Sequence, residues 1–367
     1  MWRGLVAKRD RPDLERLAAE TDAERFIWAI LPHAARSFAA SISALPKAKA
    51  RSAAVAYLYC RMLDTYEDLY PDPGRRVEEL DRFGRRLEAE DRLAPSPISA
   101  TLAKDARDRL HLLLVSRCDL VDEVFDQLEP DRQSAIVDLV RSMAEGMAWS
   151  EQVFARQDGV LADDAQLQRY CHNVIGYPAL FVLSLLDDHE PGVRATKDAL
   201  QVSEMVQLAN VTRDIEKDLD RGIAYHPALS PYRRAGGSRE QRDEAIRAVR
   251  EELLGRALHG VQAYGRLFED PGVRRSPAAR AAAVMLLSFT DLHFRSCMPR
   301  IGRKPWRGPG GPFSVVFRAW PALVSSRAAR RSITRIERNF LAAAEGLGSG
   351  ESVGRGRSVR ARPELKP

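Results

Sequence analysis

The sequence predicts an all-α protein, on three observations. Apolar residues recur at positions i, i+3, i+4 and i+7 through most of the chain, which places them on one face of a helix. The alternation of apolar and polar residues that is typical of a half-buried strand is scarce. Proline and glycine clusters separate the periodic segments, as they do between helices. These breaks fall at 45–46, 71–74, 95–97, 190–192 and 236–238.

The predicted helices follow one another between these breaks. Residues 23–44 end at Leu45-Pro46, and residues 47–70 end before the 71–74 cluster. The others end at a break or where the helical period is lost: 75–90, 98–118, 131–156, 165–187, 195–220, 239–268, 277–297 and 328–345. Pro178 predicts a kink inside its helix. Residues 304–321 have the weakest helical pattern, and a lid, a loop or an interfacial segment is expected there.

One helical domain is expected, because no repeat and no long linker divides the chain of 367 residues. It covers residues 23–345, after an N-terminal extension (1–22) and before a basic tail (346–367) that we expect to be disordered. The formal net charge of +6 is modest, and its excess lies toward the C-terminus. Peripheral membrane contact therefore stays open, whereas no nucleic-acid partner is expected. The oligomeric state is not predicted.

A cytoplasmic location, with membrane association left open, is expected from the ends and the cysteines. The first 15 residues are charged throughout and lack the apolar stretch of a signal peptide. The longest apolar stretch, 174–186, is too short to span a membrane. The four cysteines have no spacing typical of disulfides or zinc sites, which predicts buried thiols. His172 has no second histidine at ligand spacing, so a helix-packing role is favoured.

Two carboxylate clusters lie on helices that otherwise have the pattern of core helices. They are Asp64-Thr65-Tyr66-Glu67-Asp68 and Asp214-Ile215-Glu216-Lys217-Asp218. At about 100° per residue, Asp64 and Asp68 share a stripe with Tyr57 and Arg61, beside the apolar face. Asp214 and Asp218 likewise share a stripe with Gln207, and Asn210 lies at its edge.

The paired carboxylates favour a magnesium site. Two carboxylates about 4 Å apart repel by about 4 kcal/mol at an effective dielectric constant near 20, so they require a cation or must protonate. Magnesium is commonly held by one or two carboxylates and the phosphates of a substrate, which predicts a diphosphate ligand. The alternative for a single cluster is a solvated helix face. Two clusters flanked by arginine and amide side chains favour the metal site.

Several residues near the clusters fit the chemistry of an ionising diphosphate, in which the leaving charge must be neutralised and the carbocation kept from water. Arg36, Arg61 and Arg213 are suited to contact phosphate, or each pairs with a nearby carboxylate. Tyr57 and Tyr170 are suited to stabilise a cation or to handle a proton, or each is a core aromatic with a satisfied hydroxyl.

The residues from about 26 to 300 resemble the squalene and phytoene synthases, which join two isoprenyl diphosphates head to head. The resemblance begins with Arg36-Ser37-Phe38-Ala39-Ala40 and Leu45-Pro46, and continues through the segment from Tyr57 to Asp68, which looks like the first aspartate-rich motif of the family. Further matches are Gly146-Met147-Ala148, Tyr170-Cys171-His172 with Gly176, and the segment from Gln207 to Asp218.

The resemblance implies an isoprenoid synthase fold around a central cavity and farnesyl or geranylgeranyl diphosphate as substrate. It implies that a cyclopropylcarbinyl diphosphate forms, which a squalene-type enzyme reduces with NADPH and a phytoene-type enzyme converts by losing a proton. Asp64-Thr65 followed by Glu67-Asp68 resembles the squalene branch more closely. By position, the implied metal ligands are Asp64, Glu67, Asp68, Asp214 and Asp218. The implied diphosphate-binding residues are Arg36, Ser37, Arg61 and Arg213, over a polar floor of Gln207 and Asn210, with Tyr57 and Tyr170 in ionisation and proton transfer.

Three departures from the family pattern leave the product open. Ala35 stands where many members have serine, Lys217 replaces an acidic residue, and Tyr177-Pro178 interrupts a run of small residues. A transferase that gives the allylic cation to an aromatic acceptor is the second hypothesis. A non-catalytic helical protein that binds diphosphate is the third.

Overall fold

The structure, a computed structural model, describes residues 12–35, 37–89, 92–187, 191–308 and 310–348. These residues form helices and no strand, apart from an isolated parallel bridge between Val160 and Ala224. The all-α prediction is confirmed. No helix in the described part of the chain is long and apolar enough to cross a membrane.

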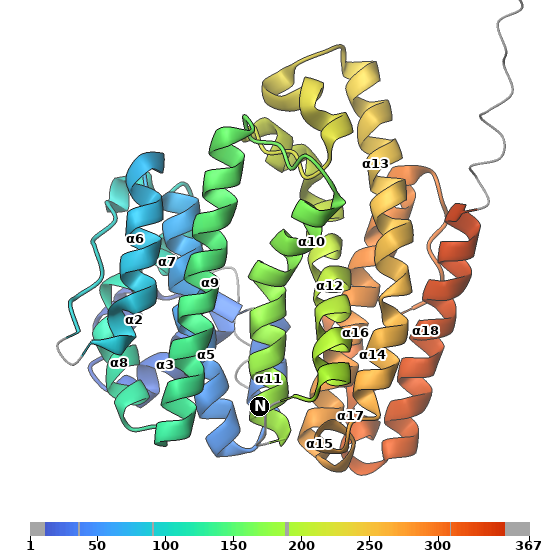
Figure 1. The fold of residues 1–367 in the computed structure, drawn as a ribbon. Helices are drawn as coiled ribbons and strands as arrows, with labels where there is room; N and C mark the ends of the chain where they lie inside the picture. Colours follow the sequence, from blue (N-terminus) through green and yellow to red (C-terminus); the bar gives the residue numbers. More distant parts are fainter. Residues whose placement is uncertain (1–11, 36, 90–91, 188–190, 309, 349–367) are drawn as a thin grey trace, which may run out of the picture.

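The N-terminal half of the chain forms one group of helices, drawn in blue to green in Figure 1. Asp72 and Asp105 cap the starts of two of them by accepting hydrogen bonds from the next backbone N–H groups. The helices are α2 (Leu14–Ala18), α3 (Ala23–Ala35), α4 (Ser37–Ser43), α5 (Lys47–Leu69), α6 (Pro73–Arg85), α7 (Ala106–Ser116), α8 (Cys118–Asp126) and α9 (Pro130–Arg156), with 3₁₀ turns η1 (Arg86–Glu88) and η2 (Ala100–Leu102).

The C-terminal half forms a second group, in green to red, and α11 lies between the two groups (Figure 1). Its helices are α10 (Asp164–Cys171), α11 (Tyr177–Asp187), α12 (Val193–Asp220), α13 (Arg239–His259), α14 (Val261–Phe268), α15 (Pro271–Arg275), α16 (Pro277–Cys297), α17 (Pro312–Val324) and α18 (Ser326–Gly348). A π-helical turn, η3 (His172–Gly176), and two 3₁₀ segments, η4 (Pro227–Ala235) and η5 (Met298–Ile301), complete the group.

Most predicted helices are present, but several are divided. Residues 23–44 form α3 and α4, residues 239–268 form α13 and α14, and residues 98–118 contain η2 and α7. The predicted 165–187 helix is α10 and α11 joined by η3, where the Tyr177 N–H bonds to the His172 carbonyl five residues back. Pro178 follows at once; it has no N–H to donate and its ring disfavours a regular helix, which agrees with the irregular turn at this point.

Other parts of the chain differ from the prediction or lie outside the described residues. The weakly patterned 304–321 segment contains most of α17, and the sequence reading missed α8, α15 and η4. Residues 14–18 of the predicted extension form α2. Arg36, the first residue of the 190–192 break and the basic tail from residue 349 on lie outside the described residues, as do residues 1–11, 90–91, 188–189 and 309.

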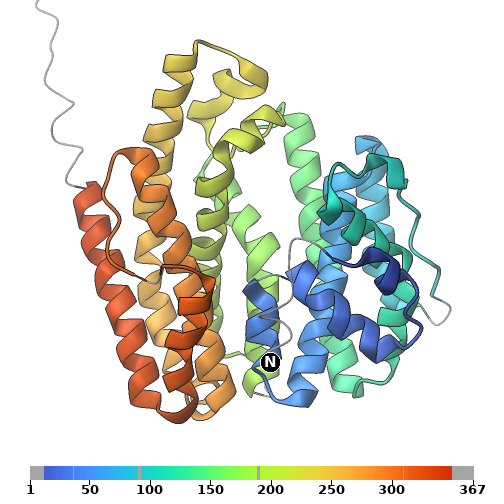
Figure 2. The same ribbon diagram turned by 180° about the vertical axis from the view of Figure 1, so that it is seen from behind.

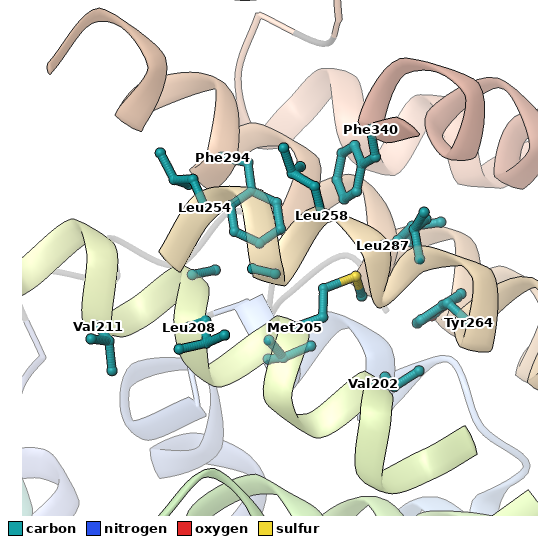
Figure 3. Packing of buried hydrophobic residues seen from close by; sticks show 14 of the residues in the cluster. Val202, Met205, Leu208, Val211, Leu254, Leu258, Tyr264, Leu287, Phe294 and Phe340 are labelled. Atoms are coloured by element: carbon teal, nitrogen blue, oxygen red, sulfur yellow. The ribbon is translucent and has the colours of Figure 1, made fainter. Parts of the chain in front are cut away.

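Two separate hydrophobic clusters fill the two groups of helices. The first contains α12, α13, α14, α16 and α18, whose buried side chains meet in Figure 3. The second contains α3, α5, α8 and α9. Helix α4 contributes to both, with Ala40 in the first cluster and Ala39 and Ile42 in the second. The structure is therefore two packed groups that meet along a seam.

A close approach between α9 and the π turn fixes the seam. Gly146 leaves no room for a side chain, because an added Cβ would lie 2.6 Å from the Asn173 Cβ. The Asn173 amide donates a hydrogen bond to the Gly146 carbonyl at 3.2 Å, and Asn173 is buried. A glycine at 146 thus lets η3 bond directly to the α9 backbone.

Gly146→Ala is expected to lower the free energy of unfolding by about 1–3 kcal/mol, since the overpacked Cβ must push η3 away. Urea unfolding followed by circular dichroism measures the loss. Gly255→Ala in α13 is the matched control: its added Cβ would meet only the Leu347 Cβ, at 3.9 Å. The control should be neutral or stabilising by up to about 1 kcal/mol, because alanine favours a helix. Equal effects of the two changes would contradict the close-approach argument.

A second close contact joins the loops that follow α9 and α12. Gly159 and Gly222 have φ of +80° and +86°, and an added Cβ on Gly159 would lie 2.1 Å from the Gly222 carbonyl oxygen. The Ala224 N–H bonds to the Gly159 carbonyl at 2.8 Å, and the Leu161 N–H bonds to the Ala224 carbonyl at 3.0 Å. This loop clasp holds the segment from Arg221 to Tyr225 against the end of α9.

Candidate active site

The first acidic turn lies near the C-terminal end of α5, next to the seam. Arg61 links Asp64 to Tyr57. One guanidinium nitrogen lies 2.9 Å from the Asp64 carboxylate, and another donates to the Tyr57 hydroxyl at 2.9 Å. The Tyr57 hydroxyl also donates to the Ala34 carbonyl, at 3.4 Å. The predicted stripe of Tyr57, Arg61 and Asp64 is therefore a connected group on one helix face.

The second acidic turn lies near the C-terminal end of α12. Arg213 binds Asp214 through two hydrogen bonds, of 2.9 and 2.5 Å. Glu216 instead pairs with the buried Arg250 at 2.5 Å, and Lys217 is exposed. Both Arg61 and Arg213 thus pair with a neighbouring carboxylate in this structure, which was the alternative role predicted for each.

The two turns meet across the seam. Arg221, directly after α12, forms an ion pair with Asp68 of α5 at 3.1 Å, over a separation of 153 residues. The charge of Asp68 also raises the pKa of Asp218, and the charge of Arg221 lowers it. The structure therefore brings Asp68 and Asp218 into one electrostatic environment, with a protein cation between the two helices.

A chain of polar side chains lies beside this contact. Tyr170 and Tyr225 have their hydroxyl oxygens 3.1 Å apart, and the Gln207 amide donates to the Tyr170 hydroxyl at 3.4 Å. The Asn210 amide donates to the Gln207 carbonyl oxygen at 3.2 Å. The predicted polar floor of Gln207 and Asn210 thus forms one hydrogen-bonded unit with Tyr170. Tyr57 is not part of this unit, because its hydroxyl bonds to Arg61 and to the Ala34 carbonyl.

Burial and repulsion raise the pKa of three of the carboxyl groups at the seam. Burial, with the charges of Asp64 and Asp68, raises the pKa of Glu67 well above its usual value, and Arg76 opposes the rise only in part. Burial and the neighbouring Asp214 raise the pKa of Asp218 to about 6. Burial also raises the pKa of Asp64, against the effect of Arg61. Burial disfavours ionisation of Asp214 too, but the hydrogen bonds and charge of Arg213, together with the charges of Lys217 and Arg300, outweigh it and lower its pKa.

The carboxylate oxygens at the seam fit a hard divalent cation whose remaining coordination positions are filled by the oxygens of a ligand. The pKa values of Glu67 and Asp218 are raised because burial and the neighbouring carboxylates together outweigh the effect of the nearby basic side chains. In the residues that the structure describes, no three carboxylate, imidazole or thiol side chains form a closed metal site. Magnesium needs no such cage, because it keeps waters and binds through one or two carboxylates and phosphate.

Burial also keeps the two tyrosine hydroxyls protonated. The pKa of Tyr170 is raised by burial and by the charges of Tyr225, Glu67 and Asp218. The pKa of Tyr225 is raised by burial and by Asp218. Each hydroxyl therefore remains a hydrogen-bond donor at neutral pH, close to the acidic turns.

The remaining predicted residues fall into three groups. Arg36 and the side chain of Ser37 lie outside the described residues. His172 lies 3.0 Å from Glu204 on α12, which agrees with the packing role. The four cysteines are buried and free. Tyr177 packs against the second hydrophobic cluster, and the predicted central cavity stays a prediction.

Sequence reasoning missed Arg221 and Tyr225. Both lie beyond the predicted helix, in a loop whose position depends on Gly159 and Gly222 having positive φ. The only signal in the sequence was the glycine after Arg221, since a glycine with positive φ marks a fixed turn. Arg76 and Glu151, which pair at 2.7 Å beside Glu67, were also missed because they come from two further helices.

Comparison with known proteins assigns the chain to a family. A family model described as squalene/phytoene synthase matches residues 31–292. The chain belongs to the squalene/phytoene synthase family. The matched segment contains both acidic turns, the π turn and the loop clasp.

Two curated relatives come from Botryococcus braunii. Squalene synthase BSS is 27% identical over 264 residues, which cover 68% of this chain and 54% of that protein. Lycopaoctaene synthase is 29% identical over 214 residues, 56% of this chain and 44% of that protein. This squalene/phytoene synthase family member thus spans about half the length of the curated relatives it matches.

Solved structures agree on the fold. A complex of TcSQS with a ligand has a TM-score of 0.63 at 19% identity and covers 88% of this chain and 99% of that one. A dehydrosqualene synthase in complex with a ligand has a TM-score of 0.50 at 17% identity, covering 86% and 96%. At these identities the likeness establishes the all-α isoprenoid synthase fold.

Proposed function

We propose that this family member is a magnesium-dependent prenyltransferase that ionises an allylic isoprenyl diphosphate, farnesyl or geranylgeranyl, and joins two such units head to head. The product would be of the squalene or phytoene type, formed through a cyclopropylcarbinyl diphosphate. The observation that carries the proposal is the meeting of the two acidic turns across the seam, where Arg221 pairs with Asp68 at 3.1 Å beside Asp218.

Metal ligands would come from both helices. Asp64, Glu67 and Asp68 of α5 and Asp214 and Asp218 of α12 supply only oxygen donors, which suits magnesium. Bound magnesium would neutralise the diphosphate and so favour its departure. Arg61, Arg213 and Arg221 already lie at these carboxylates, and their donors can turn to diphosphate oxygens. Arg36 and Ser37 stay proposed diphosphate-binding residues.

The tyrosines beside the turns would transfer the proton that the reaction releases and stabilise the carbocation. Tyr170 and Tyr225 keep their hydroxyl protons and face one another at 3.1 Å, so a proton can pass between them. Gln207 bonds to Tyr170 and orients its hydroxyl. Tyr57 has Arg61 near its ring face and hydroxyl, which holds its ring beside Asp64. Its ring face is suited to stabilise a developing carbocation.

The first test incubates the protein with farnesyl or geranylgeranyl diphosphate and magnesium, with and without NADPH. We expect magnesium-dependent release of diphosphate and a cyclopropylcarbinyl diphosphate, with a hydrocarbon when the branch-specific last step can proceed. A matched reaction with EDTA should leave the substrate intact. Intact diphosphate in every arm, despite tight binding, would support a non-catalytic binding protein and contradict the proposal.

A parallel screen with aromatic acceptors separates the second hypothesis. Prenylated aromatic product without any head-to-head product would show that the ionisation site serves an aromatic acceptor. The NADPH arm separates the two branches, because only a squalene-type last step consumes it.

A further inference from the structure

Helix α17 is apolar on two opposite faces. Its inner face packs on α16 and α18 with Val315, Ala319 and Ala322 at most 2% exposed. On the other side, Phe317, Trp320 and Val324 are 75%, 58% and 81% exposed. At about 100° per residue these three side chains lie within about 60° of arc. The outer face of a surface helix is normally polar, so α17 departs from the ordinary pattern.

These three side chains are also a cluster, not scattered exceptions. Among the residues that the structure describes, the other exposed large hydrophobic side chains are Leu93, Val182 and Val193, each on a different segment. Single exposed apolar residues are common and need no explanation, whereas a contiguous patch marks an interaction surface.

The surroundings of the patch are strongly basic. Between Asp291 and Glu337 the chain has ten lysines and arginines and no carboxylate. Four of the ten pair with carboxylates outside this stretch, namely Arg295, Arg300, Arg303 and Arg330. Helix α18 begins two residues after α17 ends, and its first turns carry exposed Arg327 and Arg331. Figure 2 shows α17 on the outside of the C-terminal group, with the start of α18 beside its end. Arg318 is exposed on α17 itself.

The charge decides among the possible occupants of this patch. A second copy of the chain would bring two basic surfaces together, which costs energy. The tail beyond residue 348 contains five basic and two acidic residues and few apolar ones, so it cannot cover an aromatic patch favourably. An anionic lipid surface satisfies both features, because tryptophan and phenylalanine favour the membrane interface and arginines favour acidic headgroups.

We propose that α17 docks this protein on the surface of a membrane that contains anionic lipid. Phe317, Trp320 and Val324 enter the interfacial region, and Arg318, Arg327 and Arg331 contact the headgroups. The helix lies in the membrane plane and does not span it, as its 13 residues require. The docking needs no substrate, so it can be tested independently of the proposed reaction.

The test is co-sedimentation of the full chain with vesicles of phosphatidylcholine, alone or mixed with phosphatidylglycerol. We expect binding to the mixed vesicles, weakened by salt. The double variant Phe317→Ser/Trp320→Ser should bind at least about tenfold more weakly, because interfacial affinity scales with buried apolar area. Arg327→Glu/Arg331→Glu should lose the preference for phosphatidylglycerol. Leu93→Ser, which removes an equally exposed side chain elsewhere, is the matched control and should bind as the parent does.

Trp320 reports insertion directly. Its fluorescence should shift to shorter wavelength on mixed vesicles, and the shift should disappear in Trp320→Phe, although the other four tryptophans remain. Circular dichroism confirms that each variant is folded. The proposal is overturned if the parent ignores the mixed vesicles or if Leu93→Ser weakens binding equally. A dimer in solution that the Phe317→Ser/Trp320→Ser variant abolishes, without vesicle binding by the parent, would assign the patch to a second copy.

Discussion

Asp64→Asn and Asp214→Asn are each expected to lower turnover of the isoprenyl diphosphate by at least about 100-fold, the scale on which a preorganised electrostatic contact acts. Each change removes a negative charge at the seam and keeps the side-chain volume. Steady-state release of diphosphate at saturating magnesium measures the loss. Far-ultraviolet circular dichroism should show unchanged helicity, because neither residue belongs to the two hydrophobic clusters.

The two variants should differ in stability, which checks the assignment of their partners. Burial already disfavours the charge of Asp64, so an amide is tolerated there. Asp214 is stabilised as an anion by Arg213, and its loss should cost up to about 1 kcal/mol, the range for a half-exposed ion pair. Asp243→Asn, on the exposed side of α13, is the control and should keep full activity. Near-normal turnover by both seam variants would show that the site lies elsewhere.

Asp218→Asn is expected to raise stability and abolish activity together. In the metal-free folded protein the pKa of Asp218 is raised to about 6 from the ordinary 3.8, so the folded state binds the proton more tightly than the unfolded state. The charge of Asp218 therefore destabilises the fold above pH 6, and this penalty shrinks as the pH falls toward 4. At pH 7.5 the amide should gain about 1 kcal/mol, a value reduced for the partial exposure of the side chain.

Thermal unfolding in EDTA at pH 7.5 and pH 4.5 measures this effect. The Asn variant should unfold at a higher temperature than the parent at pH 7.5, and the difference should shrink to about one-third at pH 4.5. Asp243→Asn should show no such pH-dependent difference. Magnesium with diphosphate should stabilise the parent and not the Asp218→Asn variant. A variant that is less stable than the parent at pH 7.5 would contradict the raised pKa.

The sequence predicted the helices and the acidic turns because both depend on local pattern. Asp64 and Asp68 are one turn apart, as are Asp214 and Asp218, and the apolar stripes beside them set the face of each helix. The chain order of these motifs also carried the family resemblance, which the family match confirms.

What the sequence did not predict depends on contacts between distant segments. Arg221 pairs with Asp68 over 153 residues, and Tyr225 reaches Tyr170 only through the loop clasp. Neither contact has a periodic signal. Pro178 predicted a kink but not the π turn, since the pattern of a helix does not show how a missing N–H is accommodated. The sequence also did not predict the apolar outer face of α17, because the exposure of a side chain depends on the tertiary structure.

The separation of the two hydrophobic clusters has an evolutionary consequence. Each cluster is filled mainly by its own helices, and the ionisable side chains of the two acidic turns lie at the seam between them. Substitutions inside one core can accumulate and compensate one another without shifting the other core or the charges at the junction. Such an arrangement lets sequences drift far apart while the reactive groups keep their places, which suits a lineage whose solved structures keep this fold at below one-fifth identity.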